Sequence, residues 1–396
     1  MKEQLLQEIV NQFGVTQEFV WEYFRLFPDL PWKKGSLDEF LNALSSLDKM
    51  YFLFAFSTVI RGRYTFGLLE SYGYIRHKGR YLDIGTAYAG FLRAFRESGF
   101  KEAVGIELQE RLVRLGKANI SDLDSAQIVQ ADFVREDFSH LGLFDVITCN
   151  DVIEHVDNPV VAFTKMAGLL TENGCLILEI PNRDYIDFVI SDGHFQIFGI
   201  AQLDRDAAAE YYAAVSNAHL DYRSEMGEMY PLWWYIDQLT RNGLTANVLD
   251  THYEKRIEDC SQLIANLKDA YIEWRRQAES RFDSRIVKGV SDAVNAYIQQ
   301  IEADFALVNN PIAQKRFENK YLRSFWTIVA TKSPPPAQSY SNEIEYLNKQ
   351  IVYLQNQISQ IQNSMSWKVT RPFRFLRRFM LHPRQAMKQL HEYLHL

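Results

Sequence analysis

The stretch YLDIGTAYAG, residues 81–90, decides the fold class. Its apolar first half is typical of a buried strand, and its small residues are typical of a tight turn that leads into a helix. Such a turn lets a ligand approach the backbone, and the first N–H groups of the helix can bind that ligand. Against the GxGxxG pattern of dinucleotide-binding turns, the spacing is Gly85-x-Ala87-x-x-Gly90, so the second glycine is replaced. A cofactor without phosphate groups tolerates this replacement better, because the second glycine lets the chain touch a pyrophosphate.

Further short apolar runs alternate with amphipathic stretches after this turn. The candidate strands are Arg80–Ile84, Ala103–Glu107, Ala126–Gln130, Phe144–Cys149, Cys175–Ile180, Gly243–Asp250 and Ser324–Thr331, and helix-like segments such as Gly90–Ser98 and Gln109–Asn119 lie between the first of them. Strands that alternate with helices at this rhythm predict a parallel sheet covered on both faces. We therefore expect an α/β protein with a Rossmann-like three-layer sandwich.

Polar residues stand where three of these strands end. Glu107 ends the second strand, where a carboxylate can accept hydrogen bonds from ribose hydroxyls, and Asp132 with Phe133 follows the third, where they can hold an adenine ring. Asn150 follows the fourth strand. Open α/β sheets bind ligands at the carboxyl ends of their strands, so these residues predict a nucleoside site. The alternative is that Glu107 and Asp132 simply cap the next helix.

Five segments carry a family resemblance: LDIGTAYAG (82–90), VGIE (104–107), QADF (130–133), FDVITCNDVIEHVDNP (144–159) and GCLILEIPN (174–182). Together they resemble the class I S-adenosylmethionine-dependent methyltransferases, particularly the subgroup similar to ubiquinone-biosynthesis O-methyltransferases. The resemblance is close over residues 75–182 and holds only in outline over residues 231–332. It departs at Ala87 and Ala89, where the family usually has glycine.

The resemblance implies S-adenosyl-L-methionine as the cofactor and a role for seven residues. Asp83, Gly85 and the turn at Ala87 would line its methionine end, Glu107 would hold the ribose, Asp132 and Phe133 the adenine, and Asn150 the amino-acid part. Two other readings stay open. The GxAxxG spacing also fits an NAD-dependent oxidoreductase, and the two alanines also fit a non-catalytic scaffold with a degenerate cofactor site.

A hydroxyl acceptor benefits from a general base beside the cofactor. His155 follows the fourth strand and is the first candidate, and His194, after the fifth strand, is the second. Asp151 and Glu154 are expected to be packing or capping groups. The three cysteines lie far apart, and no spacing typical of metal ligands is present, so no metal site is predicted.

The rest of the chain divides by composition. We expect a helical N-terminal cap (1–75), the methyltransferase-like domain (76–332) with a helical lid (about 183–241) and a helical arm (about 254–320), a linker (333–342), a coiled coil (343–365) and a basic amphipathic tail (366–396). The arm helices form an antiparallel pair or simply cover the core. The heptads of residues 343–365 favour a homo-oligomer.

The charge is uneven along the chain. The whole protein carries −7, but residues 366–390 hold seven lysines and arginines and no acid, so the remainder carries −14. An acidic body argues against nucleic acid as a partner. A basic segment interleaved with aromatic residues is typical of anionic membrane interfaces. The tail also resembles those of bacterial enzymes of surface-polysaccharide assembly.

These features give the overall expectation. No apolar stretch reaches the length of a membrane span, and the cysteine usage favours a reducing cytosol. We expect a cytoplasmic enzyme, peripheral at the inner membrane face, that O-methylates a sugar or lipid-linked glycan. A quinone-like or other small-molecule acceptor is the alternative.

Overall fold

The computed structural model describes residues 3–32, 35–216, 221–252 and 254–333. The predicted linker from residue 334 onward, the coiled coil (343–365) and the basic tail (366–396) lie outside the described residues, and they stay predictions. Within the described ranges, no helix is both long enough and apolar enough to cross a membrane.

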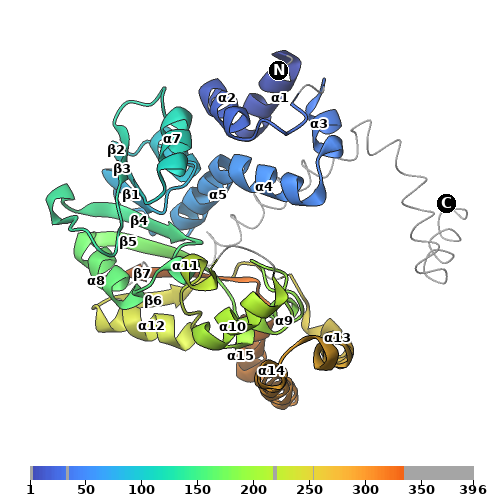
Figure 1. Cartoon of the computed structure of the whole chain (residues 1–396). Coiled ribbons are helices and arrows are strands. Elements are labelled where there is room, and N and C mark those ends of the chain that lie inside the picture. Colours follow the sequence, from blue (N-terminus) through green and yellow to red (C-terminus); the bar gives the residue numbers. More distant parts are fainter. Residues whose placement is uncertain (1–2, 33–34, 217–220, 253, 334–396) are drawn as a thin grey trace, which may run out of the picture.

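Five helices precede the sheet, as the sequence predicts. They are α1 (Glu3–Phe13), α2 (Gln17–Leu26), α3 (Leu37–Ala43), α4 (Ser46–Phe56) and α5 (Thr58–Ser71). Side-chain caps start three of them: the oxygens of Thr16, Ser36 and Ser45 each accept a hydrogen bond from a backbone N–H of the first turn. Their shared core is aromatic, with the Phe52 and Phe56 rings stacked 4.2 Å apart. These helices gather at the β2–β3 side of the sheet (Figure 1).

The seven predicted strands form one sheet. The strands are β1 (Arg80–Ile84), β2 (Glu102–Glu107), β3 (Ala126–Gln130), β4 (Phe144–Asn150), β5 (Leu170–Pro181), β6 (Thr245–Val248) and β7 (Phe325–Thr331). Their order is β3-β2-β1-β4-β5-β7-β6. Strands β1 to β5 are parallel, whereas β7 runs antiparallel to both β5 and β6. The prediction of a Rossmann-like α/β sandwich is confirmed.

Helices cover both faces of this sheet because its strands bury alternate side chains on opposite sides. On one face Tyr81 and Val146 pack with Phe91 and Phe95 of α6 (Gly90–Glu97), beside α7 (Glu110–Asn119). On the other face Leu82 packs in the core that includes α8 (Pro159–Leu169) and α12 (Leu232–Arg241). The loops with the predicted site residues therefore lie at the edge of the sheet where the parallel strands end.

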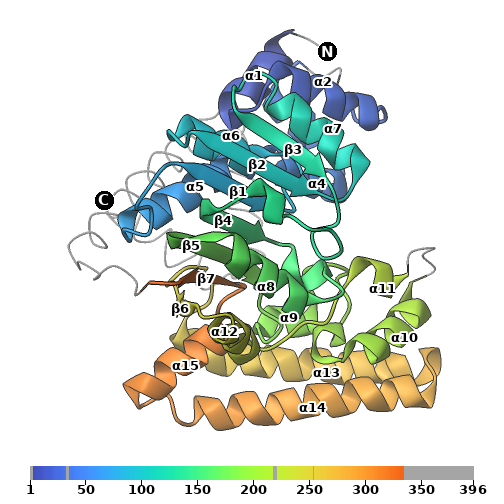
Figure 2. The same cartoon turned by 90° about the vertical axis from the view of Figure 1, so that its left-hand side faces the viewer.

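A second core lies outside the sheet. It joins α9 (Ile186–Ile190), α10 (Arg205–Val215), α11 (Tyr222–Glu225), α13 (Cys260–Arg281), α14 (Ser284–Phe305) and α15 (Pro311–Tyr321). The two long helices predicted between the last two strands are confirmed as α13 and α14, which run side by side (Figure 2). Four short 3-10 helices lie between these elements in the described residues, at Ser139–Leu141, Ile153–His155, Ile200–Gln202 and Ile257–Asp259.

Candidate active site

The turn after β1 brings two loops of the carboxyl edge into contact. Gly85 has a φ of 68°, and a Cβ built there would lie 2.3 Å from a methyl carbon of Val152, in the turn that follows β4. No side chain fits in that space, so glycine is required for both its conformation and its close approach. The β1 and β4 loops therefore form one continuous site.

Both alanines of the turn adopt the backbone that glycine favours. Ala87 has a φ of 44° and Ala89 a φ of 55°, which is the left-handed region. An L-residue pays roughly 1–2 kcal/mol there. The departure from the family pattern therefore changes side-chain volume and strain, while the turn keeps its left-handed path.

Glu107 holds this turn in place from the end of β2. Its carboxylate is buried, and its two oxygens accept hydrogen bonds from the backbone N–H groups of Ala87 and Gln109, both at 2.9 Å. The bond to Gln109, the residue before α7, is the kind expected if Glu107 only caps the next helix. The bond to Ala87 was not expected, and it places the carboxylate directly against the glycine-rich turn. Each oxygen keeps a further lone pair for a ligand.

Asp132 and Phe133 follow β3. The Asp132 carboxylate accepts hydrogen bonds from the N–H groups of Val134 (2.9 Å) and Arg135 (3.1 Å), so it caps its own turn. Phe133 is buried, and its ring stacks on Phe138 with centroids 5.5 Å apart. The proposed adenine contacts of this pair stay predictions.

Asp83 lies at the centre of the sheet edge, where it is almost fully buried. The Thr148 hydroxyl donates to its carboxylate over 2.5 Å and approaches the Tyr81 hydroxyl at 2.6 Å. Burial raises the pKa of Asp83 to about 6, against the opposing effect of the Thr148 hydrogen bond. A positively charged neighbour would therefore stabilise the ionised form of this carboxylate.

Two side chains at the end of β4 and in the turn that follows have polar atoms without partners among the described residues. Both atoms of the Asn150 side-chain amide and both carboxylate oxygens of Glu154 are buried, and none makes a hydrogen bond with the described residues. Burial raises the pKa of Glu154 well above its usual value. Buried polar groups are nearly always satisfied, so these atoms are available to hydrogen-bond a ligand or ordered water.

The structure brings the two candidate bases together. The His155 and His194 rings lie edge to face with centroids 5.3 Å apart. The His155 Nδ1 lies 2.6 Å from the Glu225 carbonyl oxygen, and its side chain is 40% exposed. His194 sits in a loop organised by the Asp192 carboxylate, and burial lowers its pKa to about 4. The sequence offered them as alternatives, and only the fold shows that they are neighbours.

Comparisons with known proteins identify relatives of part of this chain. A methyltransferase domain family model matches residues 60–238. The ubiquinone biosynthesis O-methyltransferase of Aromatoleum aromaticum is 31% identical over 109 residues, which is 27% of this chain and 45% of that protein. The corresponding protein of Xanthomonas axonopodis pv. citri is 28% identical over 193 residues, or 44% of this chain and 74% of that protein.

The match of residues 60–238 to a methyltransferase domain, together with the methyltransferase relatives, supports a class I S-adenosylmethionine-dependent methyltransferase. S-adenosylmethionine is the cofactor of this class. The first of these relatives is matched over only about half of its length. Among solved structures, PKMT2 from Rickettsia typhi in complex with AdoHcy is 17% identical at a TM-score of 0.40, covering 70% of this chain and 55% of that one. That likeness is too loose to add to the assignment.

The methyltransferase domain also carries an ionic network that the sequence did not reveal. Arg61 of α5 contacts the carboxylates of Asp151 (2.6 Å) and Glu179 (3.0 Å), and His252 approaches Glu179 at 3.3 Å. The partners hold the pKa of Glu179 below its usual value despite burial. The network ties the N-terminal helices to the ends of β4 and β5. Glu179 gave a weak signal, as the one charged residue of the predicted strand Cys175–Ile180, whereas Arg61 gave none.

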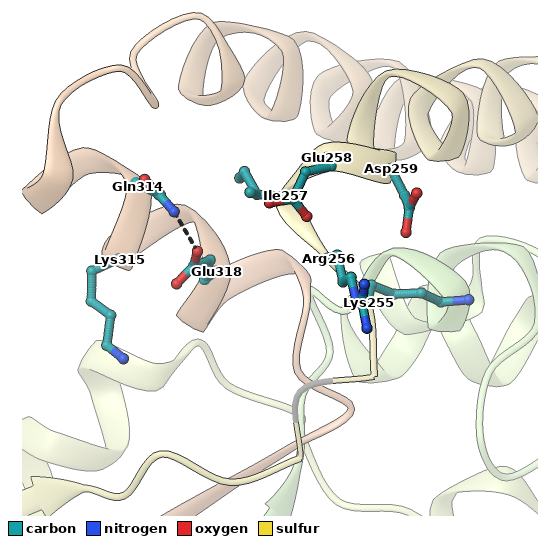
Figure 3. A pocket seen from close by; sticks show the side chains of 8 residues that line it. All are labelled: Lys255, Arg256, Ile257, Glu258, Asp259, Gln314, Lys315 and Glu318. Atoms are coloured by element: carbon teal, nitrogen blue, oxygen red, sulfur yellow. Dashed lines mark hydrogen bonds between the residues drawn. The ribbon is translucent and has the colours of Figure 1, made fainter.

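An open hollow lies elsewhere, between the start of α13 and α15 (Figure 3). It has a volume of about 700 Å³ and is lined by Lys255, Arg256, Ile257, Glu258, Asp259, Gln314, Lys315 and Glu318. Gln314 donates to Glu318 over 2.8 Å across its rim. None of the predicted site residues lines it, so it is separate from the methyltransferase site.

Proposed function

We propose that the chain transfers a methyl group from S-adenosylmethionine to a hydroxyl oxygen of an acceptor. One observation supports this above the others: the close approach of Gly85 to Val152 joins the turn that Glu107 holds to the turn after β4, which carries buried polar groups without partners among the described residues. The first turn suits a nucleoside cofactor, and the second suits a polar acceptor.

Each cofactor residue has a proposed task. Glu107 would accept hydrogen bonds from the ribose hydroxyls, and Asp132 with Phe133 would hold the adenine. Asp83 would face the positively charged methionine end, with Gly85 and Ala87 leaving room for it, and the Asn150 amide would bind the amino-acid part. Cofactor binding would then satisfy the two Asn150 atoms that have no partner among the described residues.

His155 is the proposed base. If its Nδ1–H donates to the Glu225 carbonyl, Nε2 keeps a lone pair that can accept a proton. The acceptor oxygen attacks the methyl carbon, the carbon–sulfur bond breaks, and the sulfonium becomes the neutral thioether of S-adenosylhomocysteine. The acceptor proton passes to His155, with His194 as the second candidate. Orientation of the two reactants lowers the activation free energy by roughly 7–11 kcal/mol. A general base increases the reaction rate by about 10²–10⁴-fold.

The acceptor class has two candidates. The proposal of a sugar or lipid-linked glycan as acceptor depends on the sequence of the tail (366–396), which lies outside the described residues. The proposal of a quinone-like phenol as acceptor depends on the relatives, which are named as ubiquinone biosynthesis O-methyltransferases. Mass spectrometry of surface glycans and of quinones, from cells with and without the protein, separates the two. A mass difference of 14 daltons (roughly one CH₂ group) in the glycans or in the quinones identifies that class as the acceptor.

The oxidoreductase alternative is disfavoured by the sheet. Dinucleotide-binding folds have the order 3-2-1-4-5-6, whereas here the antiparallel β7 lies between β5 and β6. The scaffold alternative loses its motivation, because Ala87 and Ala89 keep the left-handed turn.

Calorimetric titration with S-adenosylhomocysteine and with NAD tests the cofactor directly. We expect micromolar binding of S-adenosylhomocysteine and none of NAD. A preference for NAD overturns the proposal, and no S-adenosyl binding at millimolar concentration returns the scaffold reading.

A further inference from the structure

The loop that follows β3 is held from one side by a lysine of another element. Lys165 belongs to α8 and is partly buried. Its ammonium group donates hydrogen bonds to three backbone carbonyl oxygens of the loop, those of Phe133 (3.0 Å), Val134 (2.6 Å) and Glu136 (2.5 Å). An ammonium group has three donors, so all of them can be used within this one loop. The carbonyl side of the loop therefore closes around a cation that α8 supplies.

The N–H side of the same loop binds carboxylates. The Oδ1 atom of Asp132 accepts from the N–H groups of Val134 and Arg135. The Glu136 carboxylate accepts from the Asp132 N–H at 2.8 Å, and the Glu136 N–H donates to the Asp132 carbonyl at 3.0 Å. The loop thus depends on anionic groups of its own and on one cationic group from outside. Loss of the lysine ammonium removes the only part of this arrangement that links these carbonyls to α8.

The same lysine supports the aromatic part of the loop. Its Nζ atom lies 6.0 Å from the centroid of the Phe138 ring, which is within the range of a cation–π contact. Phe138 in turn stacks on the buried ring of Phe133. Helix α8 is itself fixed, because Phe163 and Met166, which flank Lys165 in the sequence, lie in the core against the sheet. Lys165 therefore transmits the position of the sheet and α8 to the loop.

The second carboxylate oxygen of Asp132 remains accessible to a ligand. Oδ1 accepts both loop N–H bonds, whereas Oδ2 contacts the exposed side chain of Arg135 at 3.3 Å. A carboxylate oxygen can accept a hydrogen bond from the 6-amino group of an adenine, but it repels a carbonyl oxygen at the same place. The direction of Oδ2 follows the path of the loop, because the carboxylate is bound to N–H groups of the loop itself.

We propose that Lys165 is a positioning residue that makes the cofactor site selective for adenine. Its three hydrogen bonds fix the loop, and the loop aims the Asp132 carboxylate and the Phe133 ring at the base. Lys165 acts through the loop and not through a contact of its own with the cofactor. The inference rests on the proposed function, because only there does this loop hold an adenine.

Calorimetric titration with two ligands tests this role. One is S-adenosylhomocysteine, and the other is S-inosylhomocysteine, in which a carbonyl oxygen replaces the 6-amino group of the base. We expect wild type to bind S-adenosylhomocysteine at least about tenfold more tightly, because the carbonyl oxygen would face the Asp132 carboxylate. Lys165→Met keeps the apolar stem without the ammonium group and should reduce this preference to less than about threefold. Lys165→Arg should regain most of it, because a guanidinium group also donates to several carbonyls.

The controls separate this role from a general loss of structure. Lys288→Met, on an exposed lysine of α14, is the matched control and should keep the wild-type preference. Near-equal far-UV circular dichroism of all variants shows that they are folded. If Lys165→Met weakens both ligands by the same factor, or leaves both unchanged, the role in selectivity is overturned. A wild type that binds the two ligands equally overturns it as well.

Hydrogen exchange without ligand distinguishes failure of this inference from failure of the proposed function. Wild type that binds neither ligand counts against the proposed function and ends the role in adenine selection with it. In the same samples, the backbone amides of Val134 and Arg135 should exchange at least about tenfold faster in Lys165→Met than in wild type. Equal exchange would show that Lys165 does not hold the loop, and it would refute the inference even if both ligands bind.

Discussion

The two halves of the carboxyl edge are built differently. On the β1–β2–β3 side, the Asp83, Glu107 and Asp132 carboxylates all accept hydrogen bonds from the protein. On the β4 side, Asn150 and Glu154 have buried polar atoms with no partner among the described residues. The first half thus satisfies its carboxylates without a ligand, and under the proposed function it is the half that holds the cofactor. The second half depends on groups that arrive from outside.

This difference separates the roles of positioning and of chemistry. Variants on the β1–β3 side should change cofactor affinity and stability, because its side chains also hold the turns together. Variants after β4 should change turnover and leave cofactor affinity in place.

The largest effect is expected from His155→Ala. Loss of the proposed general base should lower kcat by about 10²–10⁴-fold. Calorimetry should give an S-adenosylhomocysteine Kd within about twofold of wild type. If cofactor affinity falls together with kcat, the two halves are not separate, and full activity shifts the chemistry to His194.

Glu107→Gln should act in the opposite way. A glutamine offers one acceptor oxygen, so it cannot serve both Ala87 and Gln109, which each bond a carboxylate oxygen at 2.9 Å in wild type. With the ribose contact also weakened, we expect the S-adenosylhomocysteine Kd to rise about 100-fold, or about 2.7 kcal/mol. Glu18→Gln, on an exposed residue of α2 outside the site, is the control. A Kd equal to that of wild type would remove Glu107 from the cofactor site.

Asp83 predicts a pH dependence of stability. Its pKa is about 6 in the folded protein, above the usual 3.8, so the folded state holds the proton more tightly than the unfolded state. This contribution is complete below pH 3.8 and is lost as the pH rises through 6, with a size on the order of 3 kcal/mol. Denaturant unfolding at pH 4 and pH 7 should show that loss in wild type but not in Asp83→Asn. Equal differences in both proteins would refute the assignment.

The smallest effect is expected at the turn. Ala87→Gly relieves a left-handed alanine and should stabilise the protein by about 1 kcal/mol, seen as a rise of a few degrees in Tm. Cofactor affinity should stay within a factor of about three. A lower Tm would show that the alanine side chain matters more than its strained backbone.

The sequence predicted the sheet better than the site. Short, mainly apolar runs located all seven strands, but β5 starts at Leu170 instead of Cys175, because polar Glu172 and Asn173 hide its first part. The neighbourhood of His155 and His194 was not predictable, since it depends on the path of a loop that the Asp192 carboxylate organises. The Arg61 network likewise needs the packing of α5 against the sheet edge.

A crystal structure with S-adenosylhomocysteine bound tests the central claim most directly. The account predicts the ribose against Glu107, the adenine beside Asp132, and the sulfur directed towards His155 and His194. Density for the ligand on any other face of the domain, or a sulfur that points away from the two histidines, would contradict it.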